Sequence, residues 1–350
     1  MKEFLQKKLS DSKAARWSAL LIVSFTMMCG YFMTDVMSPL ESLLTTKGKI
    51  VYFTDGTSAS GNELAKQIQE VQAISKKPVA DANDLIKSFA KGQTYLLFDS
   101  ISNPHYSENN IFIKDAVISK GDSARIVPLK QVVVEKVADA AISGKGWSST
   151  EYGIFSGSYG YINVFLLMLF FGGIILDKAG IRFTGIMSSG LMLAGAAIKW
   201  YAISSDFGAS TLFGINLQVV LASLGFAIFG MGAEITGITV SKVIVKWFAG
   251  KEMALAMGLQ VAMARIGTAI ALALSLPIAR SMQAVSAPIL FGAIALAVGL
   301  LVYLVYCVMD KKEDASVARL HSQEAVTEKE EEFHIKDLKF IFQNKGFWLV

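Results

Sequence analysis

Residues 172–182 read GGIILDKAGIR, a short polar turn between two long apolar runs. Within it, Gly173, Asp177, Gly180 and Arg182 follow the order Gly-x-x-x-Asp-x-x-Gly-x-Arg. The glycines allow neighbouring helices to approach closely and the chain to turn sharply. An aspartate and an arginine near helix ends can interact with a helix dipole or with a charge on a neighbouring bundle. The alternative is a tight loop that is charged without further significance.

The rest of the chain has the composition of a membrane protein. Its 350 residues are 53% hydrophobic and 18% charged, and its mean hydropathy is +0.47. Apolar runs that could cross about 30 Å of hydrocarbon as helices recur along it. Six spans are predicted, at 17–40, 152–176, 184–204, 215–241, 252–279 and 286–309. We therefore expect an all-α polytopic membrane protein and exclude a soluble enzyme.

The loops predict an orientation and a division of the chain. Lysine and arginine residues gather in the N-terminal arm, in the turns after the second and fourth spans, and after the sixth. The positive-inside rule places this side in the cytoplasm. The expected parts are the arm with span one (1–41), an insertion (42–148), spans two to six (149–310), a charged, partly helical or disordered linker (311–345), and the start of a seventh span (346–350).

The insertion between spans one and two is predicted to be a small extracytoplasmic α/β domain. KIVYF (49–53) and TYLLF (94–98) are typical of strands. GNELAKQIQEVQAI (61–74) and LKQVVVEKVADAAI (129–142) have the periodicity of amphipathic helices. The stretch 49–68 also resembles the strand, phosphate loop and helix of flavodoxins, but Ser/Gly-rich turns are common. No cofactor is expected.

The turn at 172–182, with six spans around it, resembles the signature turn of the major facilitator superfamily, with Ile181 in place of a usual basic residue. The resemblance implies two six-helix bundles around a cavity that opens alternately to each side. This chain would supply the N-terminal bundle and linker, so a missing C-terminal bundle and the lipid bilayer are the expected partners. No Walker loop is present, so ATP is not the driving force, and no nucleic-acid partner is expected.

Two charges lie deep in the predicted spans. Glu234 interrupts AIFGMGAEITGITV (227–240), and Arg265 interrupts span five. Counted at 1.5 Å per residue from the turn that joins their helices, they lie about 18 Å and about 21 Å deep. Charges inside a membrane are costly and are functional hypotheses by default. Glu234 could bind an ammonium group and Arg265 a carboxylate, or the two could form a structural ion pair.

A closer resemblance favours the first reading. FGMGAE followed by WFAGKEMALAMGLQVAMARIG, residues 229–267, is similar to the lysosomal dipeptide uniporter group of the superfamily. In that group an acidic residue of span four and an arginine of span five bind the two ends of the peptide, which implies these roles for Glu234 and Arg265. The relatives have a short loop in place of the insertion and work with an accessory protein, so an accessory subunit is a further candidate partner.

Polar residues on other spans complete the candidate site. Tyr159 and Asn163 belong to a polar stripe on span two, which lines a cavity or contacts another helix. Tyr31 and Asp35, one turn apart on span one, form a candidate gate, although Asp35 could simply be solvated. Lys199, late in span three, is expected to extend its amine toward the membrane surface.

The sequence thus predicts a secondary transporter, not an enzyme, that carries dipeptides or other zwitterions as a uniporter. The rival functions are a proton-coupled symporter of an organic anion and a membrane-anchored receptor that uses the inserted domain. The insertion lacks an Asn-x-Ser/Thr sequon, which favours a bacterial inner membrane over a lysosomal membrane.

Overall fold

The structure is a computed structural model that describes residues 8–53, 58–60, 95–97, 112–114, 133–134, 138–165 and 168–321. These residues belong to two compact units. The first contains the described residues up to Val36, from Gly153 to Leu272 and from Ile289 onward, and the second contains those from Met37 to Tyr152 and from Ala273 to Pro288. We call the first the helical unit, because it contains most of the long helices. The second is the stem unit, which contains the strands of the insertion together with the end of α8 and the turn after it.

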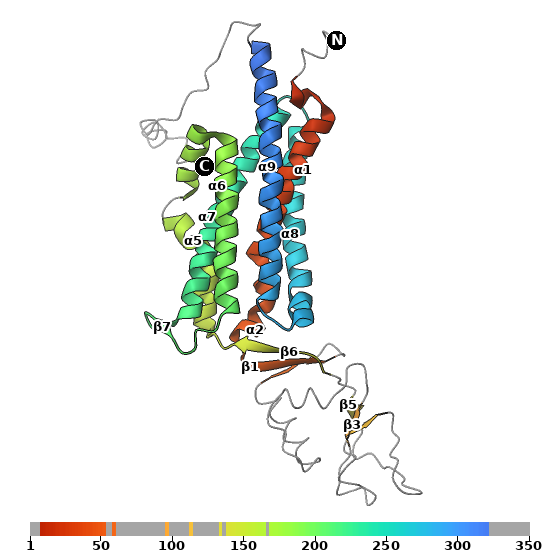
Figure 1. Cartoon of the computed structure of the whole chain (residues 1–350), viewed down its shortest axis with the longest axis vertical. Helices are drawn as coiled ribbons and strands as arrows, with labels where there is room; N and C mark the ends of the chain where they lie inside the picture. The colour runs from red at the N-terminus through yellow and green to blue at the C-terminus, as the bar shows by residue number, and fades with distance from the viewer. Residues whose placement is uncertain are drawn as a thin grey trace, which may run out of the picture. The chain divides into compact units, whose positions relative to one another are not determined.

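Long helices make up the helical unit (Figure 1). They are α1 (Lys13–Asp35), α5 (Ser149–Phe165), α6 (Met168–Ser204), α7 (Leu217–Phe248), α8 (Met253–Met282) and α9 (Ala287–His321), preceded by a 3-10 turn, η2 (Leu9–Asp11). A two-stranded hairpin, β7 (Thr211–Leu212) and β8 (Ile215–Asn216), joins α6 to α7. Asn216 accepts a hydrogen bond from the Gln218 backbone N–H and so caps the start of α7.

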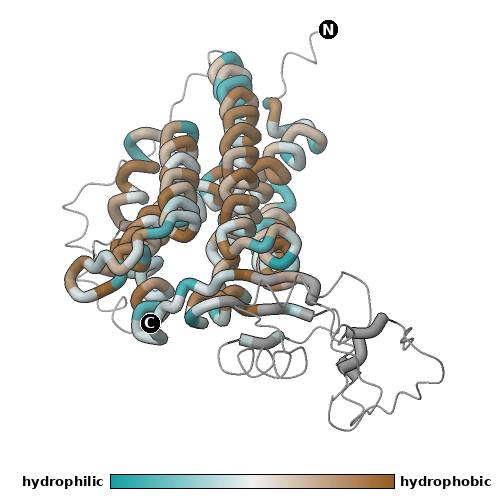
Figure 2. Tube along the Cα trace, turned by 60° about the horizontal axis from the view of Figure 1, so that its bottom comes forward, coloured by the Kyte–Doolittle hydropathy of each residue, from teal (hydrophilic) through white to brown (hydrophobic). Residues whose placement is uncertain are grey.

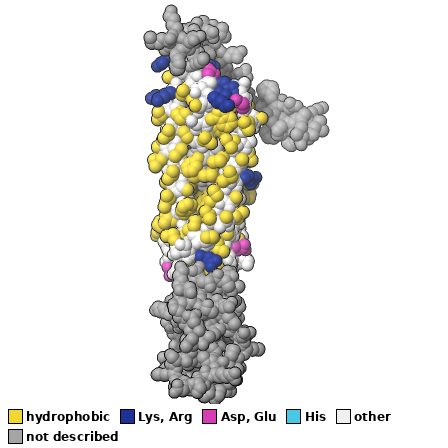
Figure 3. Space-filling model, turned by 90° about the vertical axis from the view of Figure 1, so that its right-hand side faces the viewer, with side chains coloured by type: hydrophobic (Ala, Val, Ile, Leu, Met, Phe, Trp, Pro, Cys, Tyr) yellow, Lys and Arg dark blue, Asp and Glu magenta, His cyan; other side chains and the backbone are white. Residues whose placement is uncertain are grey.

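The helices have the surface of a membrane protein. Figure 2 shows apolar residues recurring along them, and Figure 3 shows hydrophobic side chains over the middle of the helices with most charged side chains toward the ends. Leu255, Val261 and Leu301 leave more than half of their surface exposed, as expected for side chains that face lipid. Five helices are long and apolar enough to cross a membrane. The chain is therefore a multi-pass integral membrane protein.

Helix α6 reverses direction at Gly180, where φ is 78° and ψ is 170°. This conformation is nearly exclusive to glycine. Before the turn, Gly172 lies against Ile235 and Asp177 against Lys242, so the first arm runs parallel to α7. After the turn, the backbone of Ser188 lies against Gly232 and that of Lys199 against Gly225, so the second arm runs antiparallel to α7. The predicted sharp turn is confirmed.

The six-span count is not confirmed, since only five described helices meet the length and hydropathy of a span. The predicted span at 152–176 is shared between α5, which has 17 residues, and the first arm of α6. Helix α9 continues to His321, well into the predicted linker (311–345). The remainder of that linker and the expected seventh span (346–350) lie outside the described residues.

Helices α6 and α7 touch backbone to backbone. A Cβ atom at Gly195 would overlap the backbone of Phe229, and one at Gly225 would lie 2.6 Å from the Lys199 amide nitrogen. Only glycine permits such proximity. Thr236 Oγ1 also donates to Ser188 Oγ across the pair at 2.8 Å. A second layer of packing lies at the charged end of the helices, where Trp247 and Tyr306 are almost completely buried.

The stem unit is built on a sheet of order β2-β1-β6. Strand β1 (Lys47–Phe53) pairs antiparallel with both β2 (Ser58–Ser60) and β6 (Ala138–Lys145), with Ile50 opposite Ile142 and Tyr52 opposite Ala140. A second sheet, of order β4-β3-β5, contains β3 (Tyr95–Leu97), β4 (Phe112–Lys114) and β5 (Val133–Val134). Two short helical turns, η3 (Ser38–Leu40) and α2 (Glu41–Thr45), precede β1.

The strand predicted at 49–53 is confirmed, as is the one at 94–98 over its described residues 95–97, but the helix predicted at 129–142 is wrong wherever that stretch is described. Residues 133–134 pair with β3, and residues 138–142 pair with β1, where the alternation of buried Ala140 and Ile142 fits a sheet. In the flavodoxin-like reading residues 58–60 belong to the phosphate loop, but they form a strand that pairs antiparallel with β1. The helix predicted at 61–74 lies outside the described residues, so the α/β character of the insertion stays a prediction.

Candidate functional site

Glu234 lies half-buried on α7 and is bound by a tyrosine from α5. Tyr159 donates its hydroxyl to Glu234 Oε1 at 2.8 Å. Asn163 donates its amide to the Tyr159 carbonyl at 3.0 Å, while its own Oδ1 is buried without a hydrogen-bond donor among the described residues. Gly230 makes room for this contact, because a Cβ atom there would lie 2.5 Å from the Tyr159 carbonyl oxygen. The structure thus brings together three of the four predicted substrate-binding residues.

Arg265, the fourth, is exposed on α8. Its guanidinium carbon lies 6.0 Å from the centre of the Tyr31 ring on α1, at the outer limit of a cation–π contact. Among the ion pairs that the described residues form, none joins Arg265 to Glu234. The two charges therefore do not neutralise each other directly, and each is left to interact with other groups.

Asp35, in the last turn of α1, is half-buried. Thr268 Oγ1, three residues after Arg265 on α8, donates to Asp35 Oδ2 at 2.7 Å. One turn of α1 thus contacts one turn of α8 twice, through Tyr31 with Arg265 and through Asp35 with Thr268. That Tyr31 and Asp35 form a gate stays a prediction; Tyr31 lies beside Arg265, and Asp35 contacts the same helix at Thr268.

Lys199 was predicted to extend toward the membrane surface, and this is wrong. Its side chain is completely buried, and its Nζ donates to the Met33 carbonyl oxygen of α1 at 2.9 Å. The ammonium lies 4.5 Å from the centre of the Phe226 ring and 5.5 Å from that of Phe229. Position along the span could not reveal this, because the inward direction is set by the carbonyl and the two rings of neighbouring helices.

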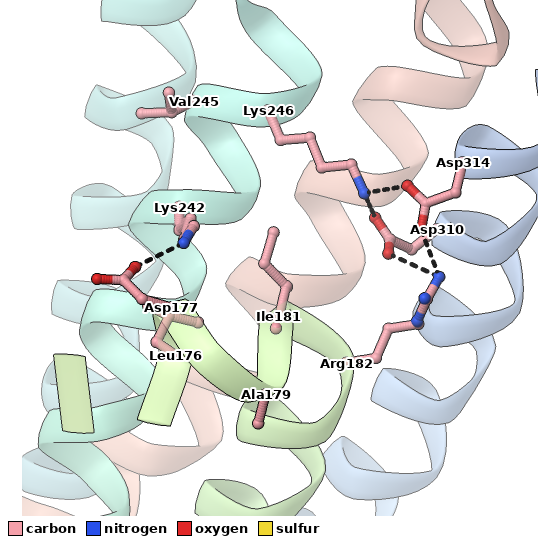
Figure 4. A pocket seen from close by; sticks show the side chains of 11 residues that line it. Leu176, Asp177, Ala179, Ile181, Arg182, Lys242, Val245, Lys246, Asp310 and Asp314 are labelled. Carbon is pink, nitrogen blue, oxygen red and sulfur yellow. Dashed lines mark hydrogen bonds and ion pairs between the residues drawn. The ribbon is translucent and has the colours of Figure 1, made fainter. Parts of the chain in front are cut away.

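The signature turn carries a dense set of ion pairs (Figure 4). Asp177 accepts from Lys242 at 2.7 Å. Arg182 contacts Asp314 at 2.7 Å and Asp310 at 3.3 Å, and Lys246 contacts both aspartates at 2.7 Å. These residues line a cavity of about 410 Å³. The sequence singled out Asp177, Gly180 and Arg182, but not the ion-pair partners on α7 and α9, because these partners lie far away along the chain. Gly173 lies outside this set, and a Cβ atom added there would meet no other described atom within 4 Å.

The N-terminal arm is fixed at the same end of the helical unit. Lys251 donates to Asp11 Oδ1 at 2.7 Å and to the Ser10 carbonyl at 2.8 Å, and the Ser10 amide donates to Glu313 Oε2 at 3.0 Å. The hydrogen bond from Lys251 is the largest influence on Asp11 and holds the pKa of that carboxyl below its ordinary value. In the described part of the chain, no group of three or more His, Cys, Asp or Glu side chains is placed to hold a metal ion.

Apolar helices long enough to cross a membrane and a charged turn between two arms of one helix define a polytopic membrane protein. Residues 134–350 match the family model of the major facilitator superfamily. The match covers more than half of the chain, so this chain belongs to the major facilitator superfamily.

The curated relatives that match include three species forms of one transporter. The lysosomal dipeptide transporter MFSD1 of Bos taurus and that of Homo sapiens are each 32% identical over 124 residues, which is 35% of this chain and 24% of the relative. The form from Danio rerio is 34% identical over 113 residues, 32% of this chain and 22% of the relative. The aligned region thus spans about a quarter of the relatives' length. No solved structure matches the chain.

Proposed function

We propose that the chain belongs to a secondary transporter that moves small zwitterionic solutes, in particular dipeptides, down their gradient by alternating access. One observation carries the proposal: Glu234 and Arg265, on the different apolar helices α7 and α8, form no ion pair with each other within the described residues. The printed name of the MFSD1 relatives, a lysosomal dipeptide transporter, supports the same solute class.

Each residue has a role that fits its contacts. Glu234 accepts the ammonium group of the peptide, and Tyr159 orients the carboxylate by donating to one oxygen. The buried Oδ1 of Asn163, which lacks a donor among the described residues, accepts a second hydrogen of the ammonium group. Arg265 binds the terminal carboxylate through its planar fork. In this proposal a second six-helix bundle closes the cavity, and Asp177 stabilises one of the two end states.

Uptake of a labelled dipeptide into proteoliposomes tests the role of Glu234. Glu234→Gln removes the charge that binds the ammonium, so we expect uptake to fall by about tenfold or more, because hydrogen bonds to charged groups are worth about 1.5–3 kcal/mol. Glu252→Gln is the matched control. Glu252 forms an ion pair of 2.9 Å with Arg16, and neither residue belongs to the candidate site. Normal uptake by Glu234→Gln would refute the proposed ligand role, and its loss from the membrane would favour a structural role.

Two other functions make different predictions in related assays. A proton-coupled symporter of an organic anion would use Arg265 for the anion and Glu234 or Asp35 for the proton, and dissipating a pH gradient would abolish concentrative uptake. A uniporter would be indifferent to the gradient. A receptor anchored by its helices would need the inserted domain, so transport that survives deletion of residues 45–145 would exclude it.

The orientation and the membrane are also proposals. We place the N-terminal arm in the cytoplasm because Lys and Arg are concentrated in the loops on that side. The missing sequon in the insertion supports a bacterial cell membrane, whereas the relatives' printed names speak of lysosomes. Protease protection of an epitope in the insertion, in oriented vesicles, tests the first point, and the insertion should be cleaved only from the extracytoplasmic side. An accessory subunit, if the protein has one, would co-purify in mild detergent.

A further inference from the structure

Lys199 is a buried cation with no carboxylate in direct contact among the described residues. Removing an ammonium group from water costs several kcal/mol unless neighbouring groups compensate. Here the compensation comes from the Met33 carbonyl at 2.9 Å and from the faces of Phe226 and Phe229. Asp35 is a longer-range electrostatic partner of the ammonium.

The Met33 carbonyl belongs to the last turn of α1, which ends at Asp35. The last four carbonyls of a helix lack backbone partners within it, and the negative end of the helix dipole lies there. Lys199 therefore caps α1 from a different helix. Because Gly195 and Gly225 bring α6 and α7 into backbone contact beside it, the lysine projects from a rigid pair.

The same end of α1 carries the contacts with α8. Tyr31 lies against Arg265, and Asp35 accepts a hydrogen bond from Thr268. A displacement of this turn would move the ring of Tyr31 relative to the guanidinium of Arg265. Lys199 holds the turn from the side of α6, while α8 holds it from the other.

We propose that Lys199 is a positioning residue that fixes the last turn of α1 and thereby sets where Tyr31 presents the Arg265 guanidinium to the carboxylate of the solute. The part that concerns the solute rests on the proposed transport function. The part that concerns the position of α1 does not, and it has a separate measurement.

Labelling of Cys29 reports the position of α1. The chain has two cysteines, Cys29 and Cys307, so Cys307→Ala leaves only Cys29, which is buried one turn before Met33. In that background Lys199→Met removes both the donor and the charge at similar volume. We expect N-ethylmaleimide to label Cys29 about tenfold faster, since losing a hydrogen bond of about 1.4 kcal/mol changes an opening equilibrium by that factor.

Lys199→Gln and Thr236→Val complete the design. Glutamine keeps a donor for the Met33 carbonyl, so labelling should remain within about twofold of the parent. Thr236→Val removes the hydrogen bond to Ser188 between the same two helices and leaves the contact of Lys199 with the Met33 carbonyl in place, so it controls for general loosening. Labelling that rises equally in Lys199→Met and Thr236→Val, or does not rise in Lys199→Met, overturns the positioning role.

Dipeptide uptake then separates positioning from a merely structural role. A positioning role predicts that Lys199→Met raises the KM for the dipeptide about tenfold, because Arg265 is misplaced, while Vmax stays nearly unchanged. Lys199→Gln should have the KM of the parent. A merely structural role predicts that Lys199→Met has a lower melting temperature but the KM of the parent, and this result overturns the proposal. Loss of both Lys199 variants from the membrane also overturns it. If only the Lys199→Met protein is lost from the membrane, the test uses Lys199→Gln. A KM and a Cys29 labelling rate equal to those of the parent then support the need for a donor at this position, and a higher KM or labelling rate refutes it. If the parent takes up no dipeptide, the proposed function fails, and Cys29 labelling still decides the position of α1.

Discussion

Replacing Asp310 by asparagine should destabilise the helical unit through the ion pairs at the signature turn. Asp310 is 3% exposed, and it accepts from Lys246 at 2.7 Å, from Tyr306 at 3.1 Å and from Arg182 at 3.3 Å. Breaking a buried pair costs about 3–5 kcal/mol when the remaining charge stays buried. Here Lys246 and Arg182 are 30% and 42% exposed and keep Asp314 as a partner. We therefore expect Asp310→Asn to lower the free energy of unfolding by about 1–2 kcal/mol.

Asp314→Asn is the matched control, because Asp314 binds the same two cations but is 45% exposed. Exposed pairs contribute about 0–1 kcal/mol, so its effect should be at most half as large. At roughly 2–4 °C per kcal/mol, Asp310→Asn should lower the melting temperature by about 2–8 °C in detergent. The measurement is fluorescence-detected thermal unfolding of both variants beside the parent. Equal shifts in the two variants, or no shift in Asp310→Asn, would refute the burial argument.

Three further predictions concern the turn, the arm and the site. Gly180→Ala should lower the free energy of unfolding by about 1–3 kcal/mol, because alanine is strained in the backbone conformation of this residue. Gly173→Ala, whose Cβ meets open space, should leave the free energy of unfolding unchanged or raise it. A thermal unfolding experiment in which Gly173→Ala is the less stable variant would contradict this. The depressed pKa of Asp11 stabilises the fold above its ordinary value of 3.8, and this contribution disappears as the pH falls through the lower folded value. Asp11→Asn should therefore show a shallower loss of melting temperature below about pH 4, and identical pH profiles would exclude the contribution. Tyr159→Phe should raise the uptake KM about two- to tenfold by removing the hydroxyl that donates to Glu234, with an unchanged KM as the contrary result.

The sequence predicted those features that follow from composition and local chemistry. Long apolar runs indicated helices that can cross a membrane, five of which the described residues contain, and Gly180 at the centre of a charged turn implied a reversal of direction, which the structure confirms. The polar spacing on span two also singled out Tyr159, whose hydroxyl contacts Glu234, while its role in binding a solute stays a prediction. These predictions succeeded because each depends on residues close together in the chain.

The failures have a common physical origin, since each depends on a partner distant in sequence. The strand at 138–145 forms because β1, some ninety residues earlier, offers a free edge, and this pairing overrides a helical periodicity. Lys199 points inward because a carbonyl of α1 and two rings of α7 receive its ammonium group. The sequence offers no sign that Asp310 and Asp314 are paired until Arg182 and Lys246, from two other helices, are placed beside them.

The glycine contacts between α6 and α7 constrain how this protein can deform. Two helices whose backbones touch at Gly195 and Gly225 have no side-chain layer between them that could slide or repack. The pair must therefore behave as one rod through any conformational cycle, and the displacement has to occur at its contacts with other helices. Two spin labels, one on α6 and one on α7, should report a single, narrow distance distribution under all conditions. The distance distribution should broaden only when one of the labels is placed on α8 instead.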